Sequence, residues 1–577
     1  MTKTILSGNE AVARGAFEAG VSFVSSYPGT PSTEITEAMI QYPSVFCEWA
    51  PNEKVALEAT LGASICGARA LSAMKQVGLN VAADPLFTAS YSGVNGGLVI
   101  AVADDPHIHS SQNEQDSRNY FRAAKIMALE PADSEECRRF TKEAFALSEK
   151  YDTPVAIRLV TRISHSQSVV MQEEPQAYQL KKYTKNFAKY VMLPVNARER
   201  HVQVSQRIID AQELAESDHY NQIIDNNSQI GVVAGGAVFQ YAREALGNRV
   251  SYLKIGLLNP LPQGLLRNYC GRFEKVYVIE ELDPYLENHM RSLGIDNVVG
   301  KNLFPMEGEL SVSLIRERIL GIRPSMKATE ALPARPPVLC SGCPHRPLFY
   351  ALKRQRLLVS GDIGCYTLGA LKPLLAMDTC ICMGASVSMA HGINKARKGE
   401  KKVVAVIGDS TFVHSGITGL IDIVYNGGTS TVIILDNSTT GMTGQQTNPA
   451  CGADIYGKTA PSVDLVALSQ AVGVRRVKVV NPFKYKLMYD TIAQEMAAPE
   501  PSVIIVQSPC TLLKTTAKGL NREVDQNLCQ KCRLCMGLGC PSLSVQNQQT
   551  LVDPLTCAGC SACQNLCRFG AIKERLP

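Results

Sequence analysis

The hydrophobic pattern in the centre of the chain predicts a β-α-β unit. Residues 402–407 and 431–436 are runs of strand length rich in β-branched side chains. The segment between them has helical spacing and ends in a Gly-Gly pair, a typical helix stop. Two parallel strands joined by a helix bring the residues that follow them to one edge of the sheet. Asp409 and Asn437 therefore lie at a predicted ligand-binding edge.

The N-terminal half shows further alternation of strand and helix patterns. Residues 1–20 predict a strand or cap followed by an amphipathic helix, and residues 21–34 predict a strand, a turn and a helix start. Another helix is predicted to begin close to Glu53, and residues 226–246 predict one more strand-helix unit. Strands that alternate with helices indicate an α/β protein built on parallel sheets.

Composition narrows the class of protein. The 577 residues suffice for three or four domains, and 45% hydrophobic and 19% charged residues are ordinary for a globular chain. A net charge of +5 gives no reason to expect nucleic acid as a partner. No window approaches twenty unbroken apolar residues, and the N-terminus lacks an apolar signal core. We therefore expect a cytoplasmic protein without a membrane partner.

Eight of the 19 cysteines lie close together near the C-terminus. Two runs of closely spaced cysteines match the bacterial two-cluster ferredoxin signature, in which three cysteines of one run and the fourth of the other hold each 4Fe–4S cluster. On that rule, one cluster is held by Cys529, Cys532, Cys535 and Cys567, and the other by Cys540, Cys557, Cys560 and Cys563. The alternative is a pair of zinc knuckles, although three cysteines at successive two-residue gaps overfill a tetrahedral site. The x4 gap before Cys540 and Arg568 in place of a proline depart from the signature.

The central strand ends have the residue types of a magnesium-held diphosphate site. Asp409 and Asn437 offer hard oxygen ligands, and glycines let backbone N–H groups approach phosphate. The 27 residues between them match the thiamine diphosphate motif, except that Ser410 stands in place of its second glycine. A plain turn is the alternative for Gly-Asp alone. The predicted coenzyme contacts are Gly384, Gly408, Asp409, Ser410, Asn437, Gly441, Met442 and Thr443. The predicted magnesium ligands are Asp409, Asn437 and Thr439.

Six motifs between residues 340 and 513 occur in an order that resembles a known family. They are "CSGCPHR", "GDIGCYTLG", "MGASVSMAHG", "GDSTFVHSG", "DNSTTGMTG" and "SPCTLL". Together with "SSYPGTPSTE" and the cysteine-rich end, they resemble the 2-oxoacid:ferredoxin oxidoreductases over essentially the whole chain. The "CPHR" and "HSG" variants resemble the alpha subunit of the indolepyruvate branch.

The resemblance implies an α/β fold class with four domains. These would be two thiamine-binding doubly wound parallel-sheet domains, a transketolase C-terminal-like α/β domain and a small two-cluster ferredoxin domain. The expected ranges are 1–180 for pyrimidine binding, 181–325 for the transketolase-like domain, 326–518 for pyrophosphate binding and 519–577 for the ferredoxin-like domain. Residues 324–337 have the composition of a linker.

The resemblance also implies a third 4Fe–4S cluster close to the coenzyme. In the family, a Cys-x-x-Cys pair, an "IGC" turn and an "SPC" turn hold it, and this chain has matches at Cys340, Cys343, Cys365 and Cys510. The alternative is that these four are buried thiols in a turn-rich wall.

In the N-terminal half, the resemblance implies roles for four residues. Thr30 would meet the substrate carboxylate, although without the resemblance a simple N-cap is the alternative. Glu53 would be the acid against the coenzyme's aminopyrimidine, with Glu58 as the competitor, and either could instead be a solvated helix-face carboxylate. Arg118 or Arg122 would meet a carboxylate or phosphate, the alternative being an exposed basic pair.

The implied activity is oxidative decarboxylation of an aryl 2-oxo acid of the indolepyruvate type with coenzyme A, with reduction of ferredoxin. The implied cofactors are thiamine diphosphate, Mg²⁺ and three 4Fe–4S clusters. The implied partners are a smaller beta subunit, in a two-plus-two heterotetramer, and a soluble ferredoxin. Two alternatives stay open: a non-oxidative thiamine diphosphate decarboxylase or ligase, and an electron-transfer subunit with an inactive thiamine fold.

Overall fold

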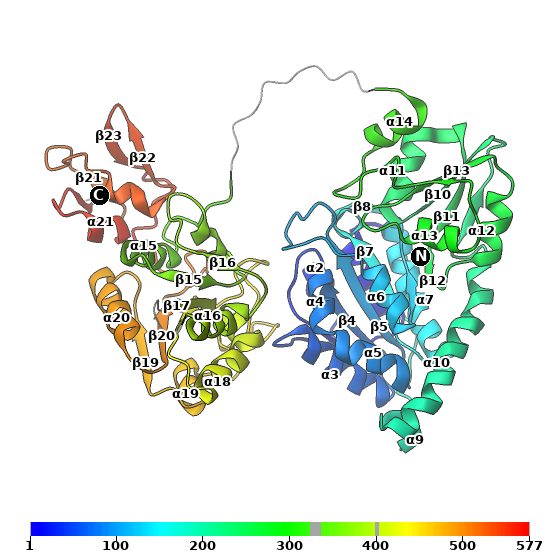
Figure 1. The fold of residues 1–577 in the computed structure, drawn as a ribbon, viewed down its shortest axis with the longest axis horizontal. Helices are drawn as coiled ribbons and strands as arrows, with labels where there is room; N and C mark the ends of the chain where they lie inside the picture. Colours follow the sequence, from blue (N-terminus) through cyan, green and yellow to red (C-terminus); the bar gives the residue numbers. More distant parts are fainter. Residues whose placement is uncertain (1, 324–335, 398–402, 576–577) are drawn as a thin grey trace. The chain divides into compact units, whose positions relative to one another are not determined.

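The computed structural model describes residues 2–323, 336–397 and 403–575. The chain divides into two compact units, Met1–Thr329 (unit 1) and Glu330–Pro577 (unit 2) (Figure 1). The division falls next to the boundary predicted at residues 325 and 326. Most of the predicted linker lies outside the described residues. Among the described residues, no helix has the length and apolar character needed to cross a bilayer.

Unit 1 is an α/β unit whose elements follow one another in alternation. Its strands are β1 (Thr2–Ser7), β2 (Phe23–Ser26), β3 (Phe46–Trp49), β4 (Ala70–Lys75), β5 (Leu98–Asp104), β6 (Met127–Leu129), β7 (Val155–Val160), β8 (Gln167–Gln172), β9 (Gln222–Ile224), β10 (Ile230–Gly235), β11 (Ser251–Ile255), β12 (Leu257–Asn259), β13 (Lys275–Ile279) and β14 (Val298–Val299). Its helices are α1 (Gly8–Glu18), α2 (Thr33–Met39), α3 (Glu53–Ile65), α4 (Gln76–Val81), α5 (Ala83–Ser92), α6 (Ser117–Ala124), α7 (Ser134–Tyr151), α8 (Thr161–His165), α9 (Phe187–Tyr190), α10 (Pro194–Ala215), α11 (Gly236–Leu246), α12 (Gln263–Cys270), α13 (Tyr285–Ser292) and α14 (Val312–Leu320), with a 3₁₀ turn at Gly247–Arg249.

Two sheets organise unit 1. A seven-stranded sheet has the order β12-β6-β7-β5-β4-β2-β3, and its strands are parallel except for the antiparallel edge strand β12. A five-stranded sheet has the order β14-β13-β10-β11-β9. Strands β4, β5 and β7 are buried along their whole length, as the central strands of a parallel sheet covered on both faces should be.

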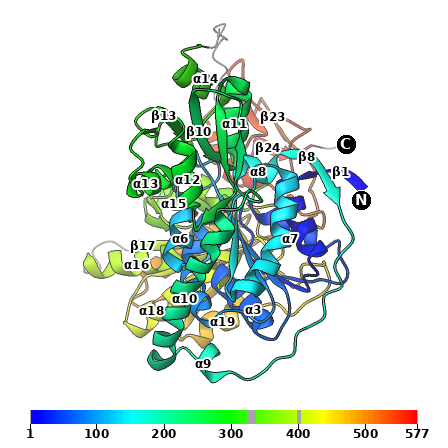
Figure 2. The ribbon, with the colours of Figure 1, turned by 90° about the vertical axis from the view of Figure 1, so that its right-hand side faces the viewer.

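Helix α10, which follows residue 190, is hydrogen-bonded to the domain that contains the seven-stranded sheet. Arg200 donates from Nε to the carbonyl of Tyr91 at 2.6 Å, and Arg207 donates from Nη1 to the carbonyl of Ser90 at 2.6 Å. Both acceptors lie in α5, so α10 packs on the layer that covers the seven-stranded sheet. Figure 2 shows α10 together with α7 in this unit.

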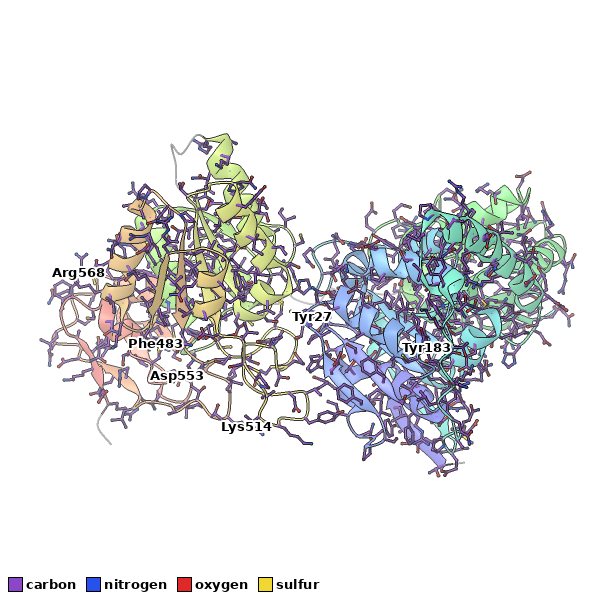
Figure 3. All side chains as sticks on the ribbon, turned by 90° about the horizontal axis from the view of Figure 1, so that it is seen from below. Tyr27, Tyr183, Phe483, Lys514, Asp553 and Arg568 are labelled. Atoms are coloured by element: carbon purple, nitrogen blue, oxygen red, sulfur yellow. The ribbon has the colours of Figure 1, made fainter. Side chains whose placement is uncertain are left out.

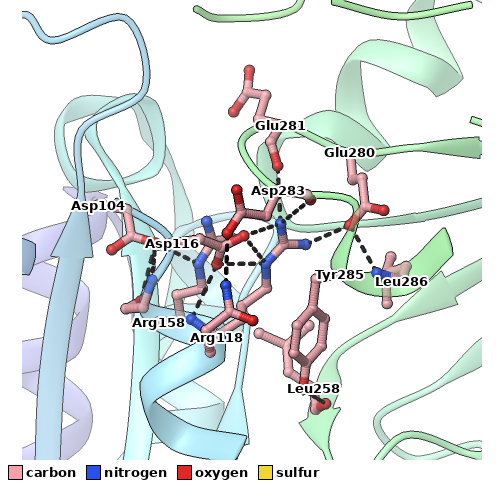
Figure 4. A network of polar contacts seen from close by, with 12 residues as sticks. Asp104, Asp116, Arg118, Arg158, Leu258, Glu280, Glu281, Asp283, Tyr285 and Leu286 are labelled. Carbon is pink, nitrogen blue, oxygen red and sulfur yellow. Dashed lines mark hydrogen bonds and ion pairs between the residues drawn. The ribbon is translucent and has the colours of Figure 1, made fainter. Parts of the chain in front are cut away.

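A buried network of arginines and acids links the two sheets of unit 1 (Figure 4). Every nitrogen of the Arg118 guanidinium donates to a protein oxygen, including Glu280 Oε2 at 2.8 Å and the Glu281 carbonyl at 2.9 Å. Arg158 pairs with Asp104 at 2.8 Å. Because these groups are cut off from water, each charge depends on its partner.

Unit 2 is a parallel α/β domain followed by a small cysteine-rich end. Its helices are α15 (His345–Gln355), α16 (Ala385–Ala396), α17 (Asp409–Thr411), α18 (Ile417–Tyr425), α19 (Leu465–Ala471), α20 (Tyr485–Ala497) and α21 (Ala562–Leu566), with 3₁₀ turns at Cys365–Ala370 and Leu534–Leu538 and a π turn at Phe412–Gly416. Its strands are β15 (Leu358–Gly361), β16 (Thr379–Cys380), β17 (Val403–Gly408), β18 (Thr431–Asp436), β19 (Arg476–Val480), β20 (Ser502–Gln507), β21 (Arg522–Val524), β22 (Leu543–Gln546), β23 (Gln549–Val552) and β24 (Ile572–Glu574).

The six-stranded sheet of unit 2 is parallel throughout, in the order β16-β15-β17-β18-β20-β19. Alternate residues of its strands face two separate cores, as the two-residue repeat of a strand requires. Val404 and Ile433 belong to the core that includes α15 and α20, whereas Ala405 and Val432 belong to the core that includes α16 and α18. The predicted β-α-β unit is therefore confirmed, except that a π turn precedes its helix.

The cysteine-rich end carries two short antiparallel pairs, β21-β24 and β22-β23. It is attached to the α/β domain by side-chain contacts within unit 2. The Asn565 side chain donates to the carbonyl of Phe483 at 2.6 Å, and Phe483 is labelled in Figure 3. Cys560 and Cys563 pack against the core of the parallel domain.

Replacing Arg118 by methionine should destabilise unit 1 by about 3–5 kcal/mol, because the buried carboxylates of Asp116 and Glu280 lose the cation between them. Chemical denaturation of the purified chain measures this loss. Arg122→Met on the same helix is the control, since Arg122 is exposed, and it should change stability by no more than about 0.5 kcal/mol. Equal effects of both substitutions would contradict the interpretation.

Glu281→Gln should stabilise the chain increasingly as pH rises from 5 to 8. Burial raises the pKa of Glu281 to about 7 from 4.5, although the Leu310 N–H and Arg158 oppose this. Between these two values the folded state binds more protons than the unfolded state, so the free energy of unfolding falls as pH rises through that window. Glutamine removes this loss, which amounts to about 3 kcal/mol above pH 7.

Thermal unfolding at a series of pH values checks the Glu281 prediction. The difference in midpoint between the variant and the parent protein should be larger at pH 8 than at pH 5. A difference that stays constant with pH would show that Glu281 does not titrate in this range.

Candidate functional site

The ends of β17 and β18 meet in unit 2, at the edge of the sheet that the sequence predicts for a ligand. Gly408 pairs with Leu435, so Asp409 and Asn437 follow neighbouring strands. The Ser438 N–H donates to Asp409 Oδ2 at 3.0 Å, and the Ser410 N–H donates to Oδ1 at 2.6 Å. The Asp409 carboxylate is thereby held against the turn that begins at Asn437.

The surroundings of Asp409 favour a nearby cation. Asp409 is 2% exposed, and burial together with the charge of Asp436 raises its pKa to about 7, against the effect of three backbone N–H groups. A divalent ion beside this carboxylate would relieve the repulsion between the two acids. A carboxylate and an amide oxygen are also the donors that Mg²⁺ prefers, so these residues fit the predicted ion.

The turn after β18 is closed by its own side chains. Thr439 Oγ1 donates to the Gln446 carbonyl at 3.2 Å, and Thr443 Oγ1 donates to Gln446 Oε1 at 2.6 Å. Thr440 Oγ1 donates to Ser410 Oγ at 3.1 Å, which joins this turn to the one after β17. Met442 is 51% exposed, so the predicted coenzyme contacts in this turn range from buried to open.

Asp362 lies at the end of β15, the strand next to β17 in the same sheet. It follows β15, and its carboxylate accepts hydrogen bonds from the N–H groups of Gly384 and Ser386, both at 2.9 Å. Gly384 has a φ of 86°, and a Cβ there would lie 2.5 Å from Ser415 Cβ. Only glycine fits this start of α16. Sequence reasoning missed Asp362, although an Asp directly after a strand run was the signal that identified Asp409.

The four cysteines predicted to hold the third cluster lie close enough together for their thiols to interact. Burial, with smaller contributions from Cys340 and Cys365, raises the pKa of Cys343 to about 12. Burial likewise raises the pKa of Cys365, with added contributions from Cys510 and Cys340.

These cysteines adjoin the turn at Asn437. The Cys510 N–H donates to the Asn437 carbonyl at 3.0 Å. A Cβ added to Gly441 would lie 3.4 Å from Cys365 Sγ and 3.6 Å from Asn437 Nδ2. Cys365 and Cys510 therefore lie next to the backbone that is predicted to hold the coenzyme.

The eight C-terminal cysteines sort into two cavities. One cavity is lined by Cys540, Cys557, Cys560 and Cys563, together with Cys343. The other is lined by Cys529, Cys532, Cys535 and Cys567. Each cavity gathers three cysteines of one run and the fourth of the other, which is the crossed arrangement that the spacing rule predicts.

In unit 1, Glu53 is the first residue of α3 and is 4% exposed. Asn52 caps the helix by accepting a hydrogen bond from the Val55 N–H at 2.9 Å. A Cβ at Gly78 would lie 2.5 Å from Glu53 Oε1, so this carboxyl is enclosed by backbone. Its competitor Glu58 is on the solvent side, paired with Lys54. Burial therefore distinguishes Glu53, which is enclosed, from Glu58, which is exposed.

Thr30 lies in the turn between β2 and α2 rather than at a helix cap. Helix α2 begins at Thr33, and Thr30 is half-buried. The Thr30 carbonyl accepts from Ser110 Oγ at 3.3 Å, and Lys75 Nζ donates to the Ser110 carbonyl at 2.9 Å. Burial lowers the pKa of Lys75 to about 8, and the charges of Asp105 and Glu53 oppose that shift. Sequence reasoning missed this lysine, whose signal was its position at the end of β4.

Comparisons with known proteins identify both halves of the chain. The family described as "Pyruvate flavodoxin/ferredoxin oxidoreductase, thiamine diP-bdg" matches residues 14–227, and "Thiamine pyrophosphate enzyme, C-terminal TPP binding domain" matches residues 362–506. "Indolepyruvate oxidoreductase subunit IorA" of Archaeoglobus fulgidus is 38% identical over 608 aligned residues, covering 99% of this chain and 97% of that protein. This chain belongs to the IorA family.

A second relative agrees with the IorA assignment. The protein of the same name from Methanothermobacter marburgensis is 38% identical and is covered to the same extent. A solved 2-oxoglutarate:ferredoxin oxidoreductase from Magnetococcus marinus has a TM-score of 0.47 at 17% identity, over 55% of this chain and 65% of that chain. Thr30 and Glu53 fall within the first family match of this IorA chain, and Asp409 and Asn437 fall within the second.

One predicted site residue of the IorA chain has a different role in the structure. Arg118 is 2% exposed and its guanidinium is fully engaged by Asp116, Glu280 and two backbone carbonyls. The carboxylates that Arg118 meets belong to the protein and not to a ligand, so Arg118 acts as a structural residue. Arg122 is exposed at the other end of α6 and remains the candidate of the pair.

Proposed function

We propose that this chain is the catalytic subunit of a thiamine diphosphate-dependent oxidoreductase that decarboxylates an aryl 2-oxo acid of the indolepyruvate type. The 2-oxo acid, coenzyme A and two oxidised ferredoxins would give an acyl-CoA, CO₂, one proton and two reduced ferredoxins. The IorA relatives support the substrate class, and both family matches support the coenzyme.

The observation that carries this proposal is the position of Cys365 and Cys510 at the Asn437–Gly441 turn, with Cys340 close enough to Cys365 to affect its charge. A non-oxidative thiamine enzyme has no use for an electron acceptor at this place. An inactive electron-transfer subunit has no use for a buried acid at Glu53 or for the acidic strand end at Asp409. Both alternatives therefore explain less of the structure than an oxidative enzyme does.

The residues of unit 2 would hold the diphosphate end of the coenzyme. Asp409, Asn437 and Thr439 are the proposed ligands of Mg²⁺, and the backbone from Gly441 to Thr443 is the proposed diphosphate cradle. When bound, thiamine diphosphate supplies the carbon nucleophile and electron sink that cleavage next to a carbonyl requires.

The residues of unit 1 would handle protons and the substrate carboxylate. Glu53, whose carboxyl is buried, is the proposed acid that would act on the pyrimidine of the coenzyme. Thr30 is proposed to meet the carboxylate of the substrate, and Lys75 adds a partly desolvated ammonium group in the same loop cluster. Such a cation attracts an anionic substrate more strongly than a solvated lysine would.

Three 4Fe–4S clusters are proposed as the route for single electrons, held by the four thiols near Gly441 and by the two C-terminal sets. Among the described residues, no three or more His, Cys, Asp or Glu side chains are positioned for a single metal ion. The cysteine spacing favours cubes over zinc knuckles, because three cysteines at successive two-residue gaps overfill a tetrahedral zinc site. A smaller partner subunit, in a two-plus-two assembly, completes the proposal.

Glu53→Gln should lower indolepyruvate-dependent ferredoxin reduction at least about 100-fold, because an amide cannot replace a carboxyl in proton transfer. The assay uses the anaerobic chain with its partner subunit, thiamine diphosphate, Mg²⁺ and coenzyme A. Glu58→Gln, on the solvent side of the same helix, should keep the parent rate. Turnover by the Glu53 variant at the parent rate would exclude the proposed role, and absence of turnover in the parent with indolepyruvate would exclude the substrate class.

Cys365→Ser should reduce the iron content of the anaerobically purified chain from about twelve to about eight atoms, since one cube of three is lost. Colorimetric iron analysis per chain measures this. Cys382→Ser is the matched control, because Cys382 is exposed and outside the group of four thiols, and it should leave the content at about twelve. About eight atoms in the parent chain would contradict the third cluster.

A further inference from the structure

Arg346 is a buried arginine that connects two cysteine loops of unit 2. It is the second residue of α15, three residues after Cys343, and is 4% exposed. Its Nε donates to the Cys340 carbonyl at 3.0 Å, and its Nη1 donates to the Leu538 carbonyl at 3.0 Å and to that of Gly539. One guanidinium therefore ties the Cys340–Cys343 loop to the segment that leads into Cys540.

The second terminal nitrogen of this guanidinium is not satisfied by the protein. Nη2 is buried and has no hydrogen-bond partner within the described part of the chain. Arg346 lines the cavity of Cys540, Cys557, Cys560 and Cys563. Burial lowers its pKa, and the thiols of Cys540, Cys343, Cys340 and Cys560 oppose that shift. A buried donor without an acceptor at a thiol-lined cavity indicates an anionic occupant.

The same two loops touch directly at another place. Ser341 Oγ lies 2.8 Å from Ser542 Oγ, and a Cβ at Gly342 would lie 2.6 Å from Ala558 Cβ. Cys343 itself lines the cavity. The Cys340–Cys343 loop is thus packed against the Cys540 set, and no residue of that loop lines the Cys529 cavity.

The two C-terminal cavities differ in the arginines that line them. Arg522, 5% exposed, also lines the Cys540 cavity, and its buried Nε has no hydrogen-bond partner among the described residues. Arg533 lines the Cys529 cavity but is half-buried, and it donates to Thr550 Oγ1 at 2.9 Å and to the Gln548 carbonyl at 2.7 Å. Its charge is therefore better screened by solvent and better satisfied by protein.

We propose that Arg346 is a positioning residue for electron transfer, whose buried charge raises the reduction potential of the cluster held by Cys540, Cys557, Cys560 and Cys563. A cube with four thiolates is anionic and gains another negative charge on reduction. A fixed cation in a water-poor site favours the reduced state. The cluster that adjoins the Cys340–Cys343 loop would thereby become the favoured acceptor of the next electron. This inference rests on the clusters of the proposed function.

The test is a redox titration of the full chain under anaerobic conditions, followed by electron paramagnetic resonance, with no 2-oxo acid present. The relevant signal is the component that Cys563→Ser removes. Arg346→Gln should lower the equilibrium constant for one-electron reduction of this component at least tenfold, which is about 59 mV. Arg346→Lys, which keeps the charge, should change this equilibrium constant by less than threefold. Arg533→Gln should leave the equilibrium constant unchanged.

Iron content distinguishes the outcomes. Arg346→Gln with full iron and a constant within twofold of the parent value would overturn the inference. If Arg346→Gln loses iron, the Arg346→Lys variant distinguishes the two explanations. Full iron in Arg346→Lys, with a reduction equilibrium constant close to the parent value, supports the role of the charge. Loss of iron in Arg346→Lys as well shows a merely structural role and overturns the inference. A parent chain without cluster signals would instead refute the clusters of the proposed function.

Discussion

Asp409 accepts hydrogen bonds from the backbone of Ser410 and Ser438, and this contact determines what the end of the parallel sheet in unit 2 can bind. It joins the turns after β17 and β18, so that the backbone near Gly441 is held in one place. The Asn437 carbonyl accepts from the Cys510 N–H, which brings the last cysteine of the group to the same turn. The proposed coenzyme site and the proposed route for electrons thus share one strand end.

Burial is what makes these groups useful. Asp409 and Glu53 are carboxyls enclosed by protein, and the four thiols near Gly441 are shielded to different degrees. Low local polarity strengthens each interaction with an ion, a proton or an electron. The same burial requires compensating charges, and the structure supplies arginines. Arg118 compensates acids between the sheets of unit 1, whereas Arg346 lies between cysteine loops with a donor left over.

The two arginines show why residue type alone does not assign a role. Both follow motif-like stretches, and both are almost completely buried. Every guanidinium nitrogen of Arg118 donates to a protein oxygen, so this residue stabilises the fold. One nitrogen of Arg346 remains unsatisfied at a thiol-lined cavity, so it is suited to an anionic group. The difference lies in the acceptors that distant segments provide, and no local pattern encodes these.

The sequence by itself determined the elements and the chemistry at their ends. Strand runs, glycine stops and cysteine spacing are local signals, and they predicted β17, β18 and the crossed grouping of the eight C-terminal cysteines. Tertiary structure decided what depends on burial and on long-range contact. It separated Glu53 from Glu58, assigned Arg118 to the fold, added Lys75 to the candidate residues of unit 1 and Asp362 to those of unit 2, and joined Arg346 to both cysteine loops. These outcomes depend on two things: the surfaces that lose contact with water, and the distant backbone atoms that come within hydrogen-bond distance. Neighbouring residues in the chain determine neither of them.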